Sequence, residues 1–228
     1  MKQIDFKYRF IPSPSQQQQQ NVADNSDKAF GPKDNQSDTL TLLLLHGTGG
    51  NEDDLIQVGQ MISPSASLLS PRGKVLENGM PRFFKRLAEG VFDMEDLKLR
   101  TRELADFVKE ASNIYSFDLN KIIAVGFSNG ANIAASLLLS YPETLMGAIL
   151  FRAMVPFIPN SPINLSDKNV LLSAGMFDPI VSESQTQSML DILEKSRANA
   201  TLKWQQSGHN LTESDILDAK EWLSENTQ

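Results

Sequence analysis

Residues 121–141 read KIIAVGFSNGANIAASLLLSY and combine two structural signals in one short stretch. The apolar run that ends at Phe127 is typical of a strand buried on both faces, and residues 129–141 are a predicted helix that stops before Pro142. Between them lies Gly126-Phe127-Ser128-Asn129-Gly130, a Gly-x-Ser-x-Gly sequence. A serine on such a sharp strand-to-helix turn exposes its hydroxyl above the end of a sheet. The stretch therefore predicts an α/β fold with a reactive serine at Ser128.

The chemistry of this predicted turn suits acyl transfer. Side chains in place of Gly126 and Gly130 would collide with the neighbouring strand and helix in so tight a turn. The positive end of the helix that begins near Asn129 points at Ser128 and would favour an oxyanion. The alternative is a glycine-rich turn without chemistry, and the position between a strand and a helix argues against it.

Strands and helices alternate along the rest of the chain. Alternation of this kind predicts a mostly parallel twisted sheet with helices on both faces. Together with the serine turn at residues 126–130 it indicates an α/β-hydrolase type of fold. Active residues of such sheets lie at the carboxyl ends of the strands. We predict strands at 39–45, 67–69, 121–127, 146–151, 170–174 and 202–206, and helices at 53–62, 97–115, 129–141, 182–197 and 212–226.

One stretch near the amino terminus differs in composition from all that follows. The 228 residues fit one domain, residues 1–228, better than two. Residues 12–38 hold the glutamine run Gln16–Gln20 and many Asn, Asp and Ser. Such a segment buries too little apolar surface to offset its ordering entropy, so we predict a flexible loop after a first strand at 4–11. A lid or a partner-binding arm is the functional alternative.

Two further polar residues follow predicted strands. Asp178 comes after the strand at 170–174, and His209 comes after the strand at 202–206. Taken singly, Asp178 could be a turn former before Pro179 and His209 an ordinary loop residue. The order serine, aspartate, histidine, each after its own strand, is the order of the catalytic triad in α/β-hydrolases. We therefore predict that Ser128, Asp178 and His209 are the catalytic residues.

The first core strand is followed by His46-Gly47-Thr48-Gly49-Gly50. Small residues there let the backbone approach a substrate, so the amides of Thr48 and Asn129 are predicted to form the oxyanion hole. A phosphate loop is the alternative, but the acidic residues at 51–54 would repel a phosphate. His46 is expected to pack and hydrogen-bond beneath this loop rather than take the proton of the serine.

Composition excludes several classes of function. The absence of cysteines rules out disulfides and thiolate catalysis, and the presence of only two histidines argues against a conventional zinc site, so we predict no metal and no cofactor. The formal net charge of −7 disfavours nucleic acid as a partner. The charged residues among the first ten are unlike a signal peptide, and no apolar run is long enough to span a bilayer. These features lead us to expect a cytoplasmic location.

The residues above resemble the phospholipase/carboxylesterase family, which includes acyl-protein thioesterases. The likeness covers about residues 39–226, and it depends on the motifs at 45–50, 126–130, 178–181 and 208–209. Residues 71–84, from Pro71-Arg72-Gly73 to Pro81-Arg82-Phe83-Phe84, are most similar to a bacterial branch of small carboxylesterases. The resemblance implies a compact hydrolase with no large cap domain and no cofactor.

The expected activity is cleavage of a small carboxylic ester through an acyl-enzyme intermediate. Acyl-thioesterase or lysophospholipase activity is the alternative, and the sequence does not choose between esters and thioesters. A non-catalytic binding protein on the same fold would be expected to lose a triad residue, and none is lost. A homodimer is left open. Candidate substrate-binding residues are Arg72, Phe83, Met154, Phe157 and Ile180.

Overall fold

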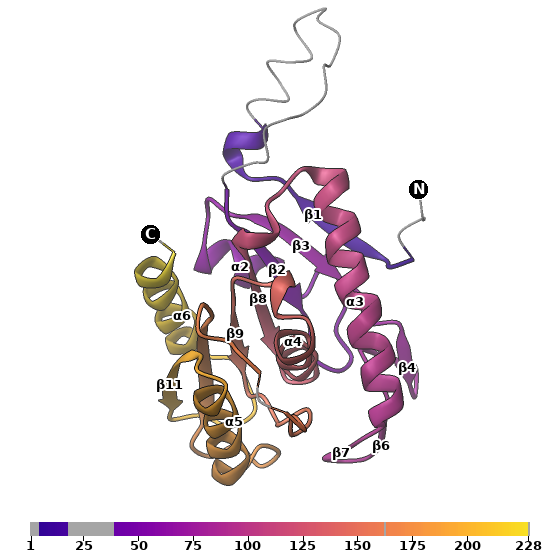
Figure 1. The fold of residues 1–228 in the computed structure, drawn as a ribbon, viewed down its shortest axis with the longest axis vertical. Helices are drawn as coiled ribbons and strands as arrows, with labels where there is room; N and C mark the ends of the chain where they lie inside the picture. Colours follow the sequence, from indigo (N-terminus) through magenta and orange to yellow (C-terminus); the bar gives the residue numbers. More distant parts are fainter. Residues whose placement is uncertain (1–4, 18–38, 162, 228) are drawn as a thin grey trace, which may run out of the picture.

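The computed structural model describes residues 5–17, 39–161 and 163–227. Their centre is a seven-stranded sheet with the strand order β1-β3-β2-β8-β9-β10-β11 (Figure 1). Only the edge strand β1 runs antiparallel to its neighbour β3, and the other pairs are parallel. The strands are β1 (Tyr8–Ile11), β2 (Thr41–Leu45), β3 (Ser67–Pro71), β8 (Ile122–Phe127), β9 (Gly147–Phe151), β10 (Asn169–Gly175) and β11 (Asn199–Gln205).

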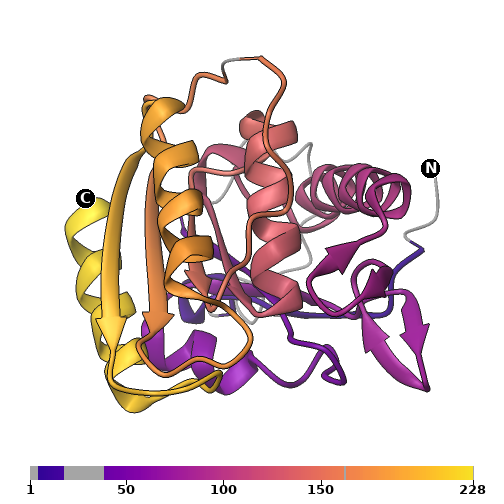
Figure 2. The same cartoon turned by 90° about the horizontal axis from the view of Figure 1, so that it is seen from below.

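Helices cover both faces of this sheet (Figure 2). One apolar cluster joins the sheet to α3 (Met94–Tyr115), α4 (Asn129–Ser140) and α5 (Glu183–Lys195). The other joins it to α2 (Ile56–Ile62) and α6 (Glu213–Asn226). Strand β2 shows why its sequence is apolar throughout, because Leu43 and Leu45 pack in the first cluster while Leu42 and Leu44 pack in the second. The predicted α/β-hydrolase fold is therefore confirmed.

The segment between β3 and α3 holds structure that the sequence did not predict. Two small antiparallel hairpins form there, made of β4 (Val75–Glu77) with β5 (Met80–Arg82) and of β6 (Arg86–Ala88) with β7 (Val91–Phe92). Asn78 and Gly79 turn the first hairpin with positive φ angles of 51° and 80°. Strands of two or three residues are too short to produce a readable alternation of apolar and polar side chains.

The expectation of a flexible loop from residue 12 is wrong for its first residues. Ser13 is fully buried, and its amide donates to Ser67 Oγ at 3.1 Å. Ser67 Oγ in turn donates to Gln16 Oε1 at 2.8 Å, and residues 14–17 are helical. Ser67, the first residue of β3, thus supplies hydrogen-bond partners for residues 13 and 16, which the composition of the segment does not reveal. The rest of the predicted loop, residues 18–38, lies outside the described part of the chain. The first strand was predicted to begin at residue 4, which is also outside the described residues, and the observed strand begins at Tyr8.

Candidate active site

Ser128 occupies a strained turn between β8 and α4. Its φ of 53° and ψ of −116° are unusual for a residue with a side chain. The turn is fixed because Ser128 N donates to Phe151 O at 2.9 Å. A Cβ atom on Gly130 would lie 1.9 Å from Leu45 O, and one on Gly126 would lie 2.6 Å from Gly130 O. Only glycine fits at these two positions, so the Gly-x-Ser-x-Gly spacing is a steric requirement of the turn.

The structure brings together the three residues that the sequence predicted as a triad. His209 Nε2 lies 2.8 Å from Ser128 Oγ, and His209 Nδ1 lies 2.7 Å from Asp178 Oδ2. Ser128 follows β8, Asp178 follows β10, and His209 lies between β11 and α6. All three are at the carboxyl edge of the sheet, where the parallel strands end.

Asp178 is held in place by its own loop. The other carboxylate oxygen, Oδ1, accepts hydrogen bonds from the amides of Ile180 at 2.8 Å and Val181 at 3.0 Å. The Asp178 side chain is 1% exposed, whereas that of His209 is 15% exposed. A carboxylate fixed at Nδ1 favours the tautomer with the proton on that nitrogen, which leaves Nε2 free to accept the proton of the Ser128 hydroxyl.

Two backbone amides next to Ser128 are free to receive a substrate oxygen. Thr48 and Asn129 line the same cavity as Ser128 and His209. Asn129 is the first residue of α4, so its amide has no partner within the helix. The Thr48 amide makes no hydrogen bond within the part of the chain that the structure describes. The amides of Thr48 and Asn129 stay the predicted donors of the oxyanion hole.

Of the five predicted substrate-binding residues, Met154 and Ile180 line this cavity, whose volume is about 340 Å³. Arg72, Phe83 and Phe157 are not among its lining residues. The Arg72 side chain is bound to the carboxylate of Glu52. Phe83 is 2% exposed and packs beside the His46 ring, and Phe157 packs on the larger apolar cluster. The structure therefore does not bring these three residues to the cavity, because closeness along the chain to a strand end does not fix the direction of a side chain.

His46 lies beneath the loop of Thr48, as the sequence suggested, and not beside Ser128. Its Nδ1 lies 2.7 Å from Gly47 O, and its Nε2 accepts a hydrogen bond from Gly73 N at 3.0 Å. The ring is 1% exposed, and this burial lowers the pKa of His46 despite the opposing effect of the Gly47 carbonyl. Nδ1 thus bonds within the loop of residues 46–50, and Nε2 joins that loop to the segment after β3.

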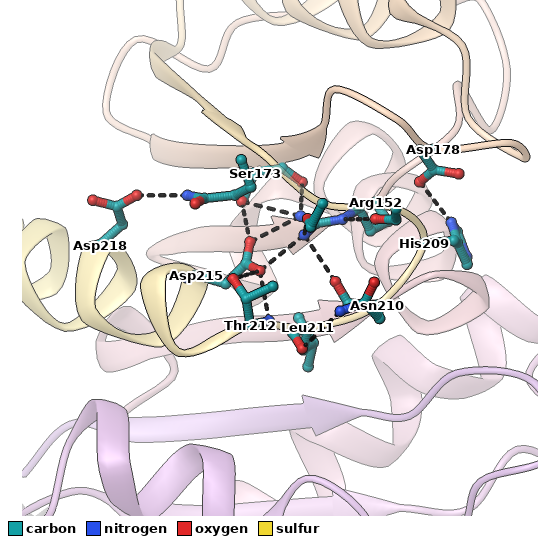
Figure 3. A network of polar contacts seen from close by, with 12 residues as sticks. Arg152, Ser173, Asp178, His209, Asn210, Leu211, Thr212, Asp215 and Asp218 are labelled. Atoms are coloured by element: carbon teal, nitrogen blue, oxygen red, sulfur yellow. Dashed lines mark hydrogen bonds and ion pairs between the residues drawn. The ribbon is translucent and has the colours of Figure 1, made fainter.

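A residue that the sequence reading missed, Arg152, holds the loop that carries His209 (Figure 3). Arg152 Nε donates to Gly208 O at 3.0 Å, and Nη2 donates to Asn210 O at 2.8 Å. These carbonyls belong to the two residues on either side of His209. The same guanidinium pairs with the fully buried carboxylate of Asp215 at the start of α6. Arg152 directly follows β9, so the rule that site residues follow strands could have singled it out.

No cluster of His, Asp or Glu side chains within residues 5–17, 39–161 and 163–227 could hold a metal ion. Within the same ranges, every helix is too short or too polar to cross a lipid bilayer.

A mostly parallel sheet with this serine turn and the Ser128–His209–Asp178 arrangement at its carboxyl edge defines an α/β-hydrolase. The sequence agrees, since the family model for phospholipases and carboxylesterases matches residues 31–227. The chain belongs to this family and is an esterase-type hydrolase.

Individual relatives support the same placement. MhqD of Bacillus subtilis is 51% identical over 184 residues, which are 81% of this chain and 92% of that protein. The crystal structure of the Bacillus cereus carboxylesterase is 44% identical, with a TM-score of 0.85 over 97% of this chain and 95% of that one. YahD, whose structure was solved with malic acid, is 32% identical, with a TM-score of 0.84 over 97% and 99% of the two chains.

Proposed function

We propose that this protein is a serine carboxylesterase that cleaves a small carboxylic ester through an acyl-enzyme intermediate. The observation that carries the proposal is the continuous hydrogen-bonded path from Ser128 Oγ through the His209 ring to Asp178. The three side chains come from separate loops, so their convergence at one edge of the sheet is a property of the fold and not of local sequence.

The first chemical step is acylation of Ser128. His209 Nε2 takes the hydroxyl proton while Oγ attacks the carbonyl carbon of the ester. The Asp178 carboxylate stabilises the imidazolium that forms. His209 then gives its proton to the leaving alcohol, and the bond between the carbonyl carbon and the alcohol oxygen breaks. In the second half, His209 takes a proton from water, and the water oxygen attacks the acyl carbon. His209 then gives the proton to Ser128 Oγ as the bond between the acyl carbon and Oγ breaks, which releases the acid and restores Ser128.

The negative oxygen of each tetrahedral intermediate would be held by the amides of Thr48 and Asn129. Both residues line the cavity that contains Ser128. A single donor of this kind lowers the barrier by about 3 kcal/mol.

A small ester fits the observations better than a long acyl chain. The cavity next to Ser128 has a volume of about 340 Å³, at the lower end of the range for ligand sites. Its lining includes the charged residues Arg82, Arg86 and Glu89, which a lysophospholipid chain would desolvate without compensation. The similar protein YahD was solved with malic acid, a small dicarboxylic acid. A thioester of the same size uses the same chemistry and is the second candidate.

The test is the hydrolysis of 4-nitrophenyl acetate and butyrate, and of acetyl and butyryl thioesters, by the wild type and by Ser128→Ala. We expect Ser128→Ala to lose at least about 10³-fold in kcat while it keeps the melting temperature. Ser188→Ala, at an exposed serine of α5, is the matched control and should retain full activity. A fluorophosphonate should label Ser128 in the wild type. Retained turnover in Ser128→Ala, or an unlabelled Ser128 in inactivated protein, would refute the proposal.

A further inference from the structure

Two arginines line the cavity that contains Ser128. Arg82 lies on β5 and Arg86 lies on β6, so each comes from one of the two hairpins between β3 and α3. The Arg82 side chain is 4% exposed and that of Arg86 is 34% exposed. Guanidinium groups beside a nucleophile are not needed for ester hydrolysis itself, so their presence calls for a separate explanation.

One carboxylate serves both arginines. Glu77 Oε2 lies 3.1 Å from Arg82 Nη1, and Glu77 Oε1 lies 3.0 Å from Arg86 Nε. Arg82 Nε also donates to Phe84 O at 3.2 Å. Nη1 and Nη2 of Arg86, and Nη2 of Arg82, have no further partner within the ranges that the structure describes. Hydrogen-bond donors of two side chains therefore remain available at the cavity.

The charges within the ion-paired group of Arg82, Arg86 and Glu77 are not balanced. Two cations share the single anion Glu77, and the pKa of Arg82 is lowered by burial and by the nearby charge of Arg86, although Glu77 opposes this. Glu89, which also lines the cavity, is exposed and forms no ion pair with either arginine among the described residues. The net positive charge of the group formed by Arg82, Arg86 and Glu77, with Glu89 exposed to solvent, favours an anionic ligand at this part of the cavity.

We infer that Arg86, supported by Arg82, forms a subsite for a carboxylate carried by the substrate. The substrate class is then an ester that bears a carboxylate in its acyl or its alcohol part. This inference deepens the proposed function, and its kinetic test rests on that function. Arg86 uses only Nε on Glu77, so the two terminal amino groups of its guanidinium can bind the two oxygens of a carboxylate. Glu77 fixes the direction of both arginines, which limits the entropy lost on binding.

Matched ester pairs test the subsite. For the acyl part, mono-4-nitrophenyl glutarate is compared with 4-nitrophenyl 5-methylhexanoate, in which two methyl groups replace the carboxylate oxygens. For the alcohol part, 3-carboxyphenyl butyrate is compared with phenyl butyrate. Spontaneous hydrolysis is subtracted with Ser128→Ala. We expect the wild type to prefer the charged ester of one pair in kcat/KM by about tenfold or more, and salt to weaken this preference.

Arg86→Gln should reduce that preference by about tenfold, mainly through KM for the charged ester, and Arg86→Lys should retain part of it. Arg9→Gln is the matched control, because it removes the same charge from an exposed arginine of β1 outside the cavity, and it should keep the wild-type preference. Hydrolysis of the neutral esters without a preference in either pair, or an unchanged preference in Arg86→Gln, would overturn the subsite and leave the esterase intact.

A binding measurement separates the subsite from the catalytic proposal. Glutarate, used as the probe, should raise the melting temperature of the wild type and of Ser128→Ala, and should raise that of Arg86→Gln much less. If no ester is hydrolysed but glutarate still stabilises the protein through Arg86, the esterase proposal fails and the subsite stands. If glutarate stabilises the wild type and Arg86→Gln equally, the subsite is refuted.

Discussion

Arg152 and Asp215 form a bidentate ion pair in which neither side chain is exposed. Nη1 donates to Oδ1 and Nη2 donates to Oδ2, both at 2.8 Å. Asp215 also accepts from Ser173 Oγ and caps α6 through the amide of Thr212 at 2.8 Å. Burial raises the pKa of Asp215, but the hydrogen bonds from Arg152, Ser173 and Thr212 outweigh it and hold that pKa below its usual value. The carboxylate stays ionised and fixes the guanidinium that holds the loop of His209.

Arg152→Met is therefore expected to harm both stability and catalysis. The substitution leaves Asp215 buried and unpaired, which costs about 3–5 kcal/mol in the free energy of unfolding. It also releases the carbonyls of Gly208 and Asn210, so His209 loses its fixed position and kcat should fall more than KM rises. Urea unfolding and steady-state kinetics on 4-nitrophenyl butyrate measure the two effects.

The double variant Arg152→Met with Asp215→Leu separates these effects. Removal of both charges should recover part of the stability, since no buried ion remains unpaired. The carbonyls on either side of His209 are still unsupported, so kcat should stay low. If activity recovers together with stability, Arg152 contributes to folding alone and does not position His209.

His46 should respond to pH through its buried neutral ring. Burial lowers its pKa in the folded state below 6.5, the ordinary value of a histidine side chain. The folded protein thus binds this proton more weakly than the unfolded chain does. The contribution of His46 to stability is complete above about pH 6.5 and is lost as the pH falls from there through the lowered folded pKa. Melting temperatures between pH 8 and 5 should decline less in His46→Gln than in the wild type.

NMR gives a direct check, because the chain has only two histidines. The ring signal that disappears in His46→Gln should titrate below 6.5 and should show the tautomer with the proton on Nδ1, since Nε2 accepts from Gly73 N. A ring that titrates above 6.5 would contradict the hydrogen bonds assigned to His46.

Gly130→Ala should destabilise the protein strongly. The added Cβ would lie 1.9 Å from Leu45 O, a backbone atom of the central strand β2 that cannot move aside cheaply. We expect a loss of at least about 3 kcal/mol in the free energy of unfolding, measured with urea. Gly208→Ala is the matched control, because its nearest atom would be 3.6 Å away, and it should change stability by less than about 1 kcal/mol. Equal losses in the two variants would show that the clash is not the cause.

The sequence predicted the fold well because the informative elements are long and buried on both faces. The run of Leu42–Leu45 and the stretch from Ile122 to Ser140 admit few arrangements other than a parallel strand and its following helix. Predicted and observed ends of the parallel strands differ by a few residues, and the largest shift among them is at β11, which begins at Asn199. The ends of elements carry little signal in the sequence, because one residue more or less at an end buries little apolar surface.

The sequence by itself determined the fold class and named Ser128, Asp178 and His209, because each follows a strand and parallel strands end at one edge of a sheet. Only the tertiary structure decided what surrounds them. Two hairpins whose strands have two or three residues bring Arg82 and Arg86 to the cavity. Arg72 instead forms an ion pair with Glu52 and does not line the cavity. Arg152 binds the carbonyl of Gly208, in the loop of His209, although the two residues are 56 positions apart in the sequence. The direction of a side chain depends on partners that are distant in sequence, so no local pattern encodes it.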